Sequence, residues 1–300
     1  MIVMLTGLTG FVGQNLAPFL NQKGFLVEGL NLRGNWQDSI LKKCNSIIHL
    51  AGKAHDLLKN SNDGEYFKIN TDLTKLVFDQ FLQSDIRDFI YFSSVKSVAD
   101  TLDDILIEDH EPVPLTPYGR SKHQAEEWLL SKRLPDGKRL FILRPCMIHG
   151  PGNKGNLNLL YKIVRKGIPY PLAGFENQRS FLSIQNLNYI IEKILTDQSI
   201  PGGVYNVADD EPLSTNEVIE IMAEAEGSKA KLWKINSGII KGIAAIGDRL
   251  RLPLNSERLK KLTESYVVSN KKIKHALKIE NLPITSREGL LTTIKSFRPN

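Results

Sequence analysis

A glycine-rich turn close to the first residue is the feature that most constrains how this chain can fold. The segment Gly7-Leu8-Thr9-Gly10-Phe11-Val12-Gly13 follows the short apolar run Ile2–Thr6 and opens a stretch with helical spacing of apolar residues. Glycines between a strand and a helix allow a tight turn, and they let backbone N–H groups and the helix N-terminus approach a pyrophosphate. The unit predicts a dinucleotide-binding site that uses Gly7, Gly10, Phe11, Val12 and Gly13.

Strand-like and helix-like segments alternate through the first half of the chain. We expect strands at Ile2–Thr6, Leu26–Leu30, Ile47–Leu50, Phe89–Ser93 and Leu140–Leu143, and helices at Phe11–Lys23, Tyr66–Gln83 and Tyr118–Lys132. This alternation favours an α/β fold of the Rossmann type, a doubly wound parallel sheet with helices on both faces. The short link between the second strand and Ile47 indicates that one βα unit is abbreviated.

The pattern becomes irregular after Pro145, where Pro/Gly turns separate the helical segments. Helices are expected at Leu157–Lys166, Asn186–Leu195, Thr215–Glu226 and Ser286–Ser296. The chain is therefore predicted to hold a Rossmann domain over residues 1–150, with parts of 180–210, and a smaller mixed substrate-binding region over residues 151–300. The apolar run Ile239–Ile246 is interpreted as a core helix of that region.

Composition narrows the class of protein. Hydrophobic content of 41% and charged content of 24% are typical of a globular protein. The two cysteines, Cys44 and Cys146, form neither a disulfide framework nor a CxxC metal site, so we expect buried thiols, no metal and a reducing compartment. Met1–Leu5 lacks the basic start of a signal peptide, and no apolar run reaches roughly 20 residues. A cytoplasmic protein without membrane insertion is expected.

The formal net charge of +6 suits a polyanionic ligand, and composition alone does not choose between nucleic acid, dinucleotide and nucleotide sugar. Residues 229–274 concentrate the charge, with twelve Lys/Arg against three Asp/Glu. Two interpretations of this stretch stay open. It is either a solvated helical surface or a positive wall that faces a diphosphate.

The end of the second strand indicates which dinucleotide binds. The position that reads the adenosine ribose lies about 20 residues beyond the last glycine, and here it holds Asn31, followed by Arg33. A carboxylate at this position would repel a 2′-phosphate, whereas Asn31 does not and Arg33 could bind one. Arg33 could equally be a surface loop residue. NADP(H) is favoured over NAD(H), with the loop Leu50-Ala51-Gly52 expected to pass beneath the cofactor.

Tyr118 and Lys122 stand four residues apart and therefore share one helix face. A phenol with a pKa near about 10 is a poor acid–base catalyst at neutral pH. A neighbouring ammonium and a cationic nicotinamide would favour the phenolate and lower that pKa. Ser94, at the end of the preceding strand, could hydrogen-bond the substrate oxygen. The three residues are predicted to form the catalytic set.

With these motifs in place, the chain resembles the extended short-chain dehydrogenase/reductase family, which comprises nucleotide-sugar epimerases, dehydratases and ketoreductases. The resemblance covers essentially the whole chain and includes Ile48-His49-Leu50-Ala51, Asn70 of a helix-start motif, Phe92-Ser93-Ser94, Arg144-Pro145 and Gly203-Val204-Tyr205-Asn206-Val207. It implies an enzyme with a UDP-sugar substrate, no nucleic-acid partner and a homodimer as one arrangement. It also implies cofactor contacts from Asn70, Tyr118, Lys122 and Pro145, and substrate contacts from Ser94, Val95, Lys96, Asn156, Leu157 and Arg179.

Departures from the family pattern narrow the set of reactions that this chain is expected to catalyse. Val95-Lys96 stands where the 4,6-dehydratases carry Asp-Glu, so that elimination has no evident catalyst. Met147 replaces an Asn before the Gly150-Pro151 turn, and Ser180 replaces the Asp after Arg179. A closer resemblance to bacterial 4-ketoreductases of the UDP-N-acetylquinovosamine type lies in Ser93-Ser94-Val95-Lys96, Gly150–Asn156, Pro169–Ala173 and Asn177–Phe181.

Three functions follow from the resemblance. The leading hypothesis is an NADPH-dependent reductase of a UDP-4-keto-6-deoxy-hexosamine in surface polysaccharide biosynthesis. The alternative enzyme is a UDP-hexose 4-epimerase of the UDP-glucose/UDP-galactose type, which returns its hydride to the sugar. A non-catalytic NADP-sensing Rossmann protein is the alternative from another class.

Overall fold

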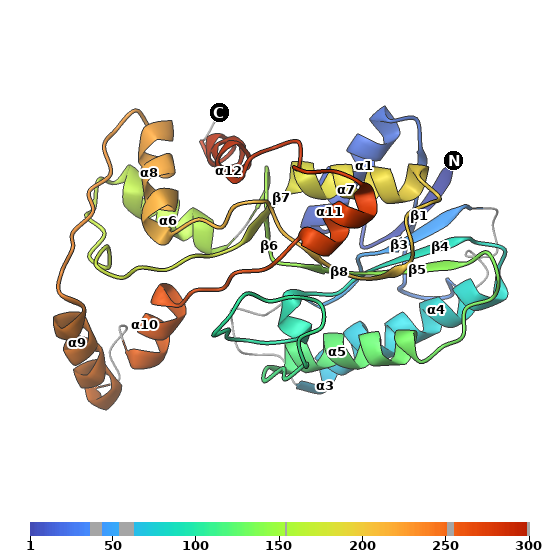
Figure 1. Ribbon diagram of the computed structural model, residues 1–300, viewed down its shortest axis with the longest axis horizontal. Coiled ribbons are helices and arrows are strands. Elements are labelled where there is room, and N and C mark those ends of the chain that lie inside the picture. The colour runs from blue at the N-terminus through green and yellow to red at the C-terminus, as the bar shows by residue number, and fades with distance from the viewer. Residues whose placement is uncertain (37–43, 54–62, 154, 251–254, 299–300) are drawn as a thin grey trace.

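The central sheet of the protein, seen in a computed structural model, contains six parallel strands in the order β2-β1-β3-β4-β5-β8 (Figure 1). The structure describes residues 1–36, 44–53, 63–153, 155–250 and 255–298. The strands are β1 (Ile2–Thr6), β2 (Leu26–Leu30), β3 (Ser46–His49), β4 (Asp88–Phe92), β5 (Arg139–Pro145) and β8 (Gly203–Val207). Nearly every residue of β3, β4 and β5 is buried, because helices cover both faces of a parallel sheet.

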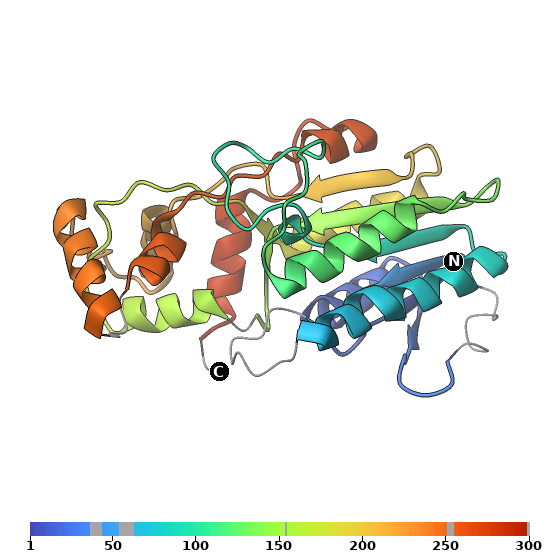
Figure 2. The ribbon, with the colours of Figure 1, turned by 90° about the horizontal axis from the view of Figure 1, so that it is seen from below.

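The two helical layers lie on opposite faces of this sheet (Figures 1 and 2). One layer consists of α1 (Phe11–Gln22), α7 (Ile184–Thr196) and α11 (Lys271–Leu277). The other begins with α3 (Asp63–Tyr66), the π-helical turn η1 (Phe67–Asp72) and α4 (Leu73–Gln83), and it ends with α5 (Pro117–Leu130). Each layer has its own apolar core, the first with Leu16 and Ile190 and the second with Phe78 and Leu129.

A smaller lobe extends from the carboxyl ends of the strands (Figure 1). It contains the two-stranded parallel sheet of β6 (Met147–His149) and β7 (Phe181–Ser183). Its helices are α6 (Asn156–Arg165), α8 (Thr215–Ala225), α9 (Ser237–Leu250), α10 (Ser256–Thr263) and α12 (Ser286–Lys295). The short 3-10 helix η2 (Val95–Ser97) follows the carboxyl end of β4, the end of the sheet from which the lobe extends. Among the described residues, no helix combines the length and apolar composition needed to cross a bilayer.

The predicted fold class is confirmed, and the predicted strands agree with the observed ones to within two residues at each end. Three details differ. The helical segment before β4 begins at Asp63, so that Asn70 lies in its interior and not at its start. Cys146 is buried, but Cys44 is only half-buried. The run Ile239–Ile246 is helical, although three of its isoleucines are exposed, so its assignment as a core helix is wrong for that face.

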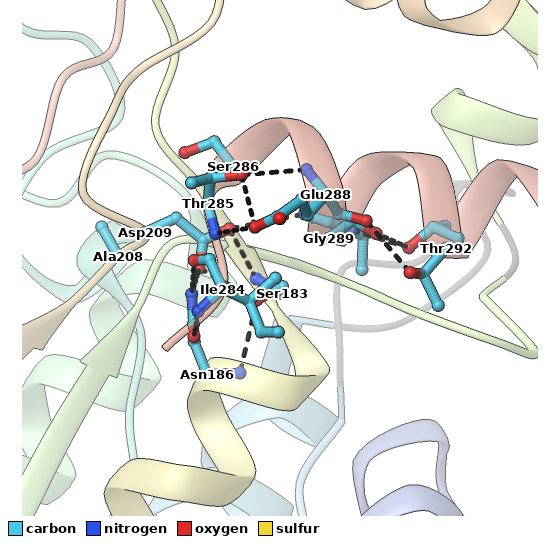
Figure 3. Close-up of polar contacts among 12 residues, drawn as sticks. Ser183, Asn186, Ala208, Asp209, Ile284, Thr285, Ser286, Glu288, Gly289 and Thr292 are labelled. Carbon is cyan, nitrogen blue, oxygen red and sulfur yellow. Dashed lines mark hydrogen bonds and ion pairs between the residues drawn. The ribbon is translucent and has the colours of Figure 1, made fainter. Parts of the chain in front are cut away.

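A buried carboxylate connects the lobe to the sheet (Figure 3). Asp209 follows β8 and accepts hydrogen bonds from the Ser183 N–H at 2.9 Å and from Asn186 Nδ2 at 2.7 Å. Asn186 also donates to the carbonyl oxygen of Ile284 at 2.8 Å, just before α12. The start of α12 is closed by a capping box between Thr285 and Glu288. The polar network therefore fixes the start of α7 and the start of α12 relative to the last strand.

A second buried carboxylate joins two strands of the sheet at their amino ends. Asp88, fully buried at the start of β4, accepts from Arg139 Nε at 2.8 Å and from Arg87 Nη2 at 2.8 Å. Burial alone would raise the pKa of Asp88, but the two guanidinium groups outweigh that cost and hold it below 3.8. Arg139 also donates to the carbonyl oxygens of Ile194 and Ile200, and so connects β5 to the end of α7.

We predict that Asp88→Asn lowers the free energy of unfolding by about 3 kcal/mol at neutral pH, because it leaves two partly buried cations unpaired. Since the pKa of Asp88 is lowered on folding, its stabilising contribution is present above 3.8 and lost as the pH falls through the folded-state value. The difference between the two proteins should shrink in acid. Urea denaturation measures it, with the exposed Asp85→Asn as control. Equal stability of Asp88→Asn and the unmodified protein at neutral pH would contradict this assignment.

Candidate active site

The loop between β1 and α1 requires its glycines for two different reasons. Gly7 has a φ of +70°, and a Cβ there would lie 2.9 Å from the backbone nitrogen of Ala51. A Cβ on Gly13 would lie 2.5 Å from the carbonyl oxygen of Gly7. Any side chain at either position would push the loop away from β3 or from α1. The sequence therefore holds this backbone close to the neighbouring loop, as the glycine motif predicts.

The N-terminus of α1 has no side-chain cap. Its N-cap residue is Gly10, and no acidic residue lies in the first turn. The first helical hydrogen bond to the preceding loop comes from the Gln14 N–H, which donates to the carbonyl oxygen of Gly10 at 2.9 Å. An uncapped helix N-terminus offers free N–H groups and the positive end of the helix dipole to an anion. This terminus is suited to a pyrophosphate.

A cavity of about 800 Å³ lies over the carboxyl ends of β1, β2 and β3. Of the predicted cofactor residues, its wall includes Gly7, Gly10, Asn31, Arg33, Leu50, Ala51 and Gly52. Lys53 and Glu65, which the sequence did not single out, also line it and form an ion pair at 2.5 Å. The wall described does not include the other predicted cofactor residues, which are Phe11, Val12, Gly13, Asn70, Tyr118, Lys122 and Pro145. Val12 packs against the core, and Pro145 ends β5 beside Val207.

Asn31 and Arg33 form a tight turn at the edge of this cavity. The Arg33 N–H donates to Asn31 Oδ1 at 3.0 Å, so the amide of Asn31 is held in place by the chain two residues on. Both side chains are exposed to solvent. The cavity thus meets an amide and a guanidinium where a carboxylate would favour an unphosphorylated ribose.

Asn70 lies outside the cavity wall and holds the loop that lines it. Its side chain is fully buried, accepts from the Lys53 N–H at 2.7 Å and donates to Ser121 Oγ at 3.0 Å. The loop that follows β3 is held on its other side by Thr6, whose Oγ1 accepts from the Ala51 N–H at 3.0 Å. These bonds fix the floor of the cavity between β1 and α5. The π-helical turn that presents Asn70 is a feature often found at functional sites.

The predicted catalytic residues lie on two neighbouring elements. Ser94 follows β4 and caps η2, and its Oγ accepts from the Lys96 N–H at 3.2 Å. Tyr118 and Lys122 lie in the first turns of α5, whose start is capped by Thr116. A Cβ on Gly119 would lie 2.3 Å from the carbonyl oxygen of Lys96. Because only glycine fits there, α5 can pack directly against the loop that carries Ser94.

The ionisation of Tyr118 differs from the sequence-based expectation. Burial raises the pKa of Tyr118 above 10.0, a hydrogen bond with Ser94 opposes the rise, and the nearby Tyr66 adds to it. The expected lowering by Lys122 is therefore wrong for the protein by itself. Desolvation dominates, and the phenol is protonated at neutral pH.

Lys122 is almost fully buried beneath the cavity. Its Nζ donates to the carbonyl oxygen of Phe92 at 2.7 Å, and a Cβ on Gly52 would lie 3.2 Å from the same nitrogen. Burial lowers the pKa of Lys122 from 10.5 to about 8, while the carboxylate of Glu126 opposes that change. The side chain thus reaches from α5 past β4 to the loop that lines the cavity.

Glu126 is a residue of this site that the sequence reasoning missed. It is 1% exposed, accepts from Ser97 Oγ at 2.6 Å and from Arg144 Nη2 at 2.6 Å, and also receives a hydrogen bond from Ser93 Oγ. The two serines lie on either side of Ser94 in the chain, so the carboxylate holds the loop that carries Ser94 against α5. The available signal was its spacing, since Glu126 lies one helical turn beyond Lys122 on the same face.

The predicted substrate residues fall into two groups. Lys96 and Arg179 are partly buried and close enough for the charge of Arg179 to lower the pKa of Lys96, although burial is the larger cause. The Lys96 ammonium lies 3.9 Å from the centre of the Tyr266 ring. By contrast, the side chains of Val95 and Leu157 are buried in apolar cores, so only their backbone could meet a ligand.

Asn156 is exposed at the start of α6. It is connected to the Lys96–Arg179 group only indirectly: Leu157 packs with Leu213, whose N–H donates to the carbonyl oxygen of Arg179 at 2.8 Å. Two cations beside an aromatic ring can bind a diphosphate.

Comparison with known proteins agrees with this geometry. The family model described as the NAD dependent epimerase/dehydratase family matches residues 3–208, more than half of the chain. The UDP-glucose 4-epimerase of Vibrio cholerae is 30% identical over an alignment of 249 positions, and the alignment covers 74% of this chain and 75% of that protein.

Two solved structures share the fold over nearly the whole chain. RMD from Pseudomonas aeruginosa, complexed with NADPH, has a TM-score of 0.73 at 20% identity and covers 99% of this chain and 98% of its own. The UDP-glucuronic acid 4-epimerase from Bacillus cereus, in complex with NAD, has a TM-score of 0.76 at 19% identity with the same coverage. At such identities the likeness concerns the fold.

The burial of Lys122 predicts a pH-dependent stability. Because its pKa falls from 10.5 to about 8 on folding, the unfolded chain binds the extra proton between these values, and stability should rise with pH in that window. Lys122→Met should raise the free energy of unfolding at neutral pH by up to about 3 kcal/mol, and its advantage should disappear towards pH 10.5. Denaturation across this range measures the change, with the exposed Lys68→Met as control. An advantage that stays constant with pH would disprove it.

Proposed function

The chain belongs to the NAD dependent epimerase/dehydratase family, a family of enzymes, and from this premise we propose that it catalyses NAD(P)-dependent oxidoreduction at C4 of a nucleotide-diphosphate sugar. The specific reaction we infer is NADPH-dependent reduction of a UDP-4-keto-6-deoxy-hexosamine. The proposal is supported chiefly by Lys122, whose ammonium lies next to Gly52 in the wall of the glycine-lined cavity, and by the hydrogen bond between Tyr118 and Ser94 on the neighbouring elements. Such a step in surface polysaccharide biosynthesis would belong in the cytoplasm, and a homodimer is compatible with it.

Tyr118 is suited to donate the proton. A carbonyl that accepts a hydride at carbon must take a proton at oxygen, and the phenol is a proton donor held beside Ser94. The Ser94 hydroxyl can hydrogen-bond the same oxygen and orient it.

The residues of the cavity fit a nicotinamide dinucleotide. The close backbone approach at Gly7 and Gly13 and the uncapped start of α1 suit a pyrophosphate. Asn31 and Arg33 would meet the adenosine ribose, and Lys122, which lies beneath the Gly52 loop, would meet the nicotinamide ribose. When bound, the dinucleotide supplies the hydride. The guanidinium of Arg33 and the absence of a carboxylate at residue 31 support NADP(H).

The residues that follow Ser94 support reduction in preference to elimination. Val95 is packed in the core, and the ammonium of Lys96 donates to the carbonyl oxygen of Asp100 at 2.7 Å. Neither residue can act as the acid–base pair that removes water from the sugar. Lys96 and Arg179 instead provide positive charge for the diphosphate. The substrate would therefore reach this enzyme already as a 4-ketone.

A UDP-hexose 4-epimerase is the second candidate, favoured by the similarity to the Vibrio cholerae enzyme of that name. It would use the same catalytic set, but its hydride would return to the sugar. A non-catalytic NADP sensor is less well supported, because it would have no use for the Ser94–Tyr118–Lys122 arrangement.

We predict that the purified protein consumes one NADPH for each UDP-4-keto-6-deoxy-N-acetylhexosamine converted, because the hydride stays on the product. The loss of NADPH absorbance, followed together with product formation, measures the ratio. Tyr118→Phe should lower turnover by about 10²–10⁴-fold through loss of the proton donor, with little effect on cofactor binding. Interconversion of UDP-glucose and UDP-galactose without added cofactor would replace the reductase by the epimerase.

We also predict that the protein binds NADPH more tightly than NADH, and that Asn31→Asp weakens NADPH binding by at least about tenfold. The new carboxylate would keep the hydrogen bond from the Arg33 N–H but would repel the 2′-phosphate. Asn35→Asp, which adds the same charge outside the cavity wall, is the matched control. Fluorescence titration with both cofactors decides the outcome. Tighter binding of NADH by the unmodified protein would overturn the cofactor assignment.

A further inference from the structure

Helix α9 carries an apolar stripe on its outer surface. Ile239, Ile243 and Ile246 are 59%, 46% and 56% exposed. They are separated by four and then three residues, the spacing that places side chains on one helix face. Three half-exposed isoleucines aligned on one face are unusual for a helix in contact with water. Single exposed apolar residues are normal on a protein surface, but an aligned group of them is not.

The opposite face of α9 is already occupied. Ile240 and Ala244 are buried and pack with Leu172 and Leu259 in a core of their own. The packing against α10 fixes how the helix is rotated, so the exposed stripe cannot turn inward without breaking that core. The stripe is therefore available to something outside the folded chain.

Positively charged residues are concentrated in the sequence before, within and after α9. The exposed cations on α9, on the segment that leads into it and on α10 are Lys229, Lys231, Lys234, Lys241, Arg249 and Lys260. None of them forms an ion pair with any residue in the described part of the chain. Trp233, four residues before the helix, is 57% exposed. Isoleucines, a tryptophan and unpaired cations together are the composition of a helix that lies in a membrane interface.

The position of α9 suits such a contact. It lies at the end of the molecule remote from the main sheet in both views (Figures 1 and 2). None of its residues lines the dinucleotide cavity. A flat surface could therefore meet α9 without covering that cavity.

We propose that α9, with Trp233 and the surrounding lysines, docks on the surface of an anionic lipid bilayer. The isoleucines enter the boundary between headgroups and acyl chains, and the cations bind the acidic headgroups. The helix lies on the membrane and does not cross it. This contact is independent of the reaction proposed above and would hold the enzyme at a membrane surface.

The charge and the apolar area of this surface favour a lipid bilayer over a second copy of the chain or a nucleic acid. A second copy of the chain would bring an equally positive surface, and three isoleucines with one tryptophan fall well short of the roughly 800 Å² per partner of a stable protein interface. A nucleic acid would match the charge but would leave the apolar stripe in water. Only an anionic lipid surface satisfies both the cations and the isoleucines.

Sedimentation of the full-length protein with lipid vesicles tests the proposal. We expect binding to vesicles of phosphatidylglycerol and phosphatidylcholine in equal parts, little binding to pure phosphatidylcholine, and weaker binding as salt is raised. Ile243→Ser should lower the partition coefficient by about tenfold or more, and Lys234→Ala by about fivefold. Fluorescence should shift to the blue on binding, since Trp233 is the most exposed of the three tryptophans.

The control is Leu76→Ser, which removes an apolar side chain of similar exposure (52%) from α4 and should leave vesicle binding unchanged. The proposal is overturned if anionic vesicles do not bind, or if Ile243→Ser binds them as well as the unmodified protein does. It is also overturned if light scattering shows that Ile243→Ser converts a dimer to a monomer. Binding of duplex DNA that competes with vesicles and survives Ile243→Ser would assign the cations to nucleic acid instead.

Discussion

The ion pair between Glu126 and Arg144 holds the two halves of the candidate site together. Both side chains are nearly inaccessible to water, and a buried charge is tolerated only where partners replace its hydration. Glu126 belongs to the helix that carries Tyr118 and Lys122, and it receives hydrogen bonds from the two serines that flank Ser94. Arg144 anchors the same carboxylate to β5. One buried charge cluster thus connects the helix that carries Tyr118 with the loop that carries Ser94.

Much of the architecture could be predicted because it depends on local sequence patterns. Alternating apolar runs located the strands, and the glycine turn located the cavity, since both depend on neighbouring residues. Ser94, Tyr118 and Lys122 were selected from spacing and order along the chain, and their catalytic role stays a prediction. The pKa of Tyr118 could not be predicted in this way, because the burial that raises it depends on how α5 packs against the loop after β4. Asn70 was recognised, but its bonds to Lys53 and Ser121 show that it shapes the cavity from outside the wall.

The lobe illustrates a different limit. Its helices except α10 were predicted from the sequence, but which face each helix buries depends on partners distant in the chain. Ile240 and Ile239 are neighbours of the same residue type, yet one is buried against Leu172 and the other is exposed. No local rule separates them. The two interpretations of residues 229–274, a solvated helical surface and a positive wall that faces a diphosphate, both stay predictions, because they differ in what the cations face and not in the local sequence pattern.

β2 lies at the edge of the main sheet, and in the described structure it pairs only with β1. The predicted abbreviation of the βα unit after β2 falls largely on residues 37–43, which lie outside the described residues. The turn that holds Asn31 and Arg33 projects from this border strand, with both side chains in solvent and little packed around them. Substitutions at these two positions cost little folding stability, because they disturb no core. The proposed choice of dinucleotide would consequently be the property of this enzyme that drift or laboratory selection alters most freely, while the buried surroundings of Ser94, which follows β4 three strands further in, tolerate little change.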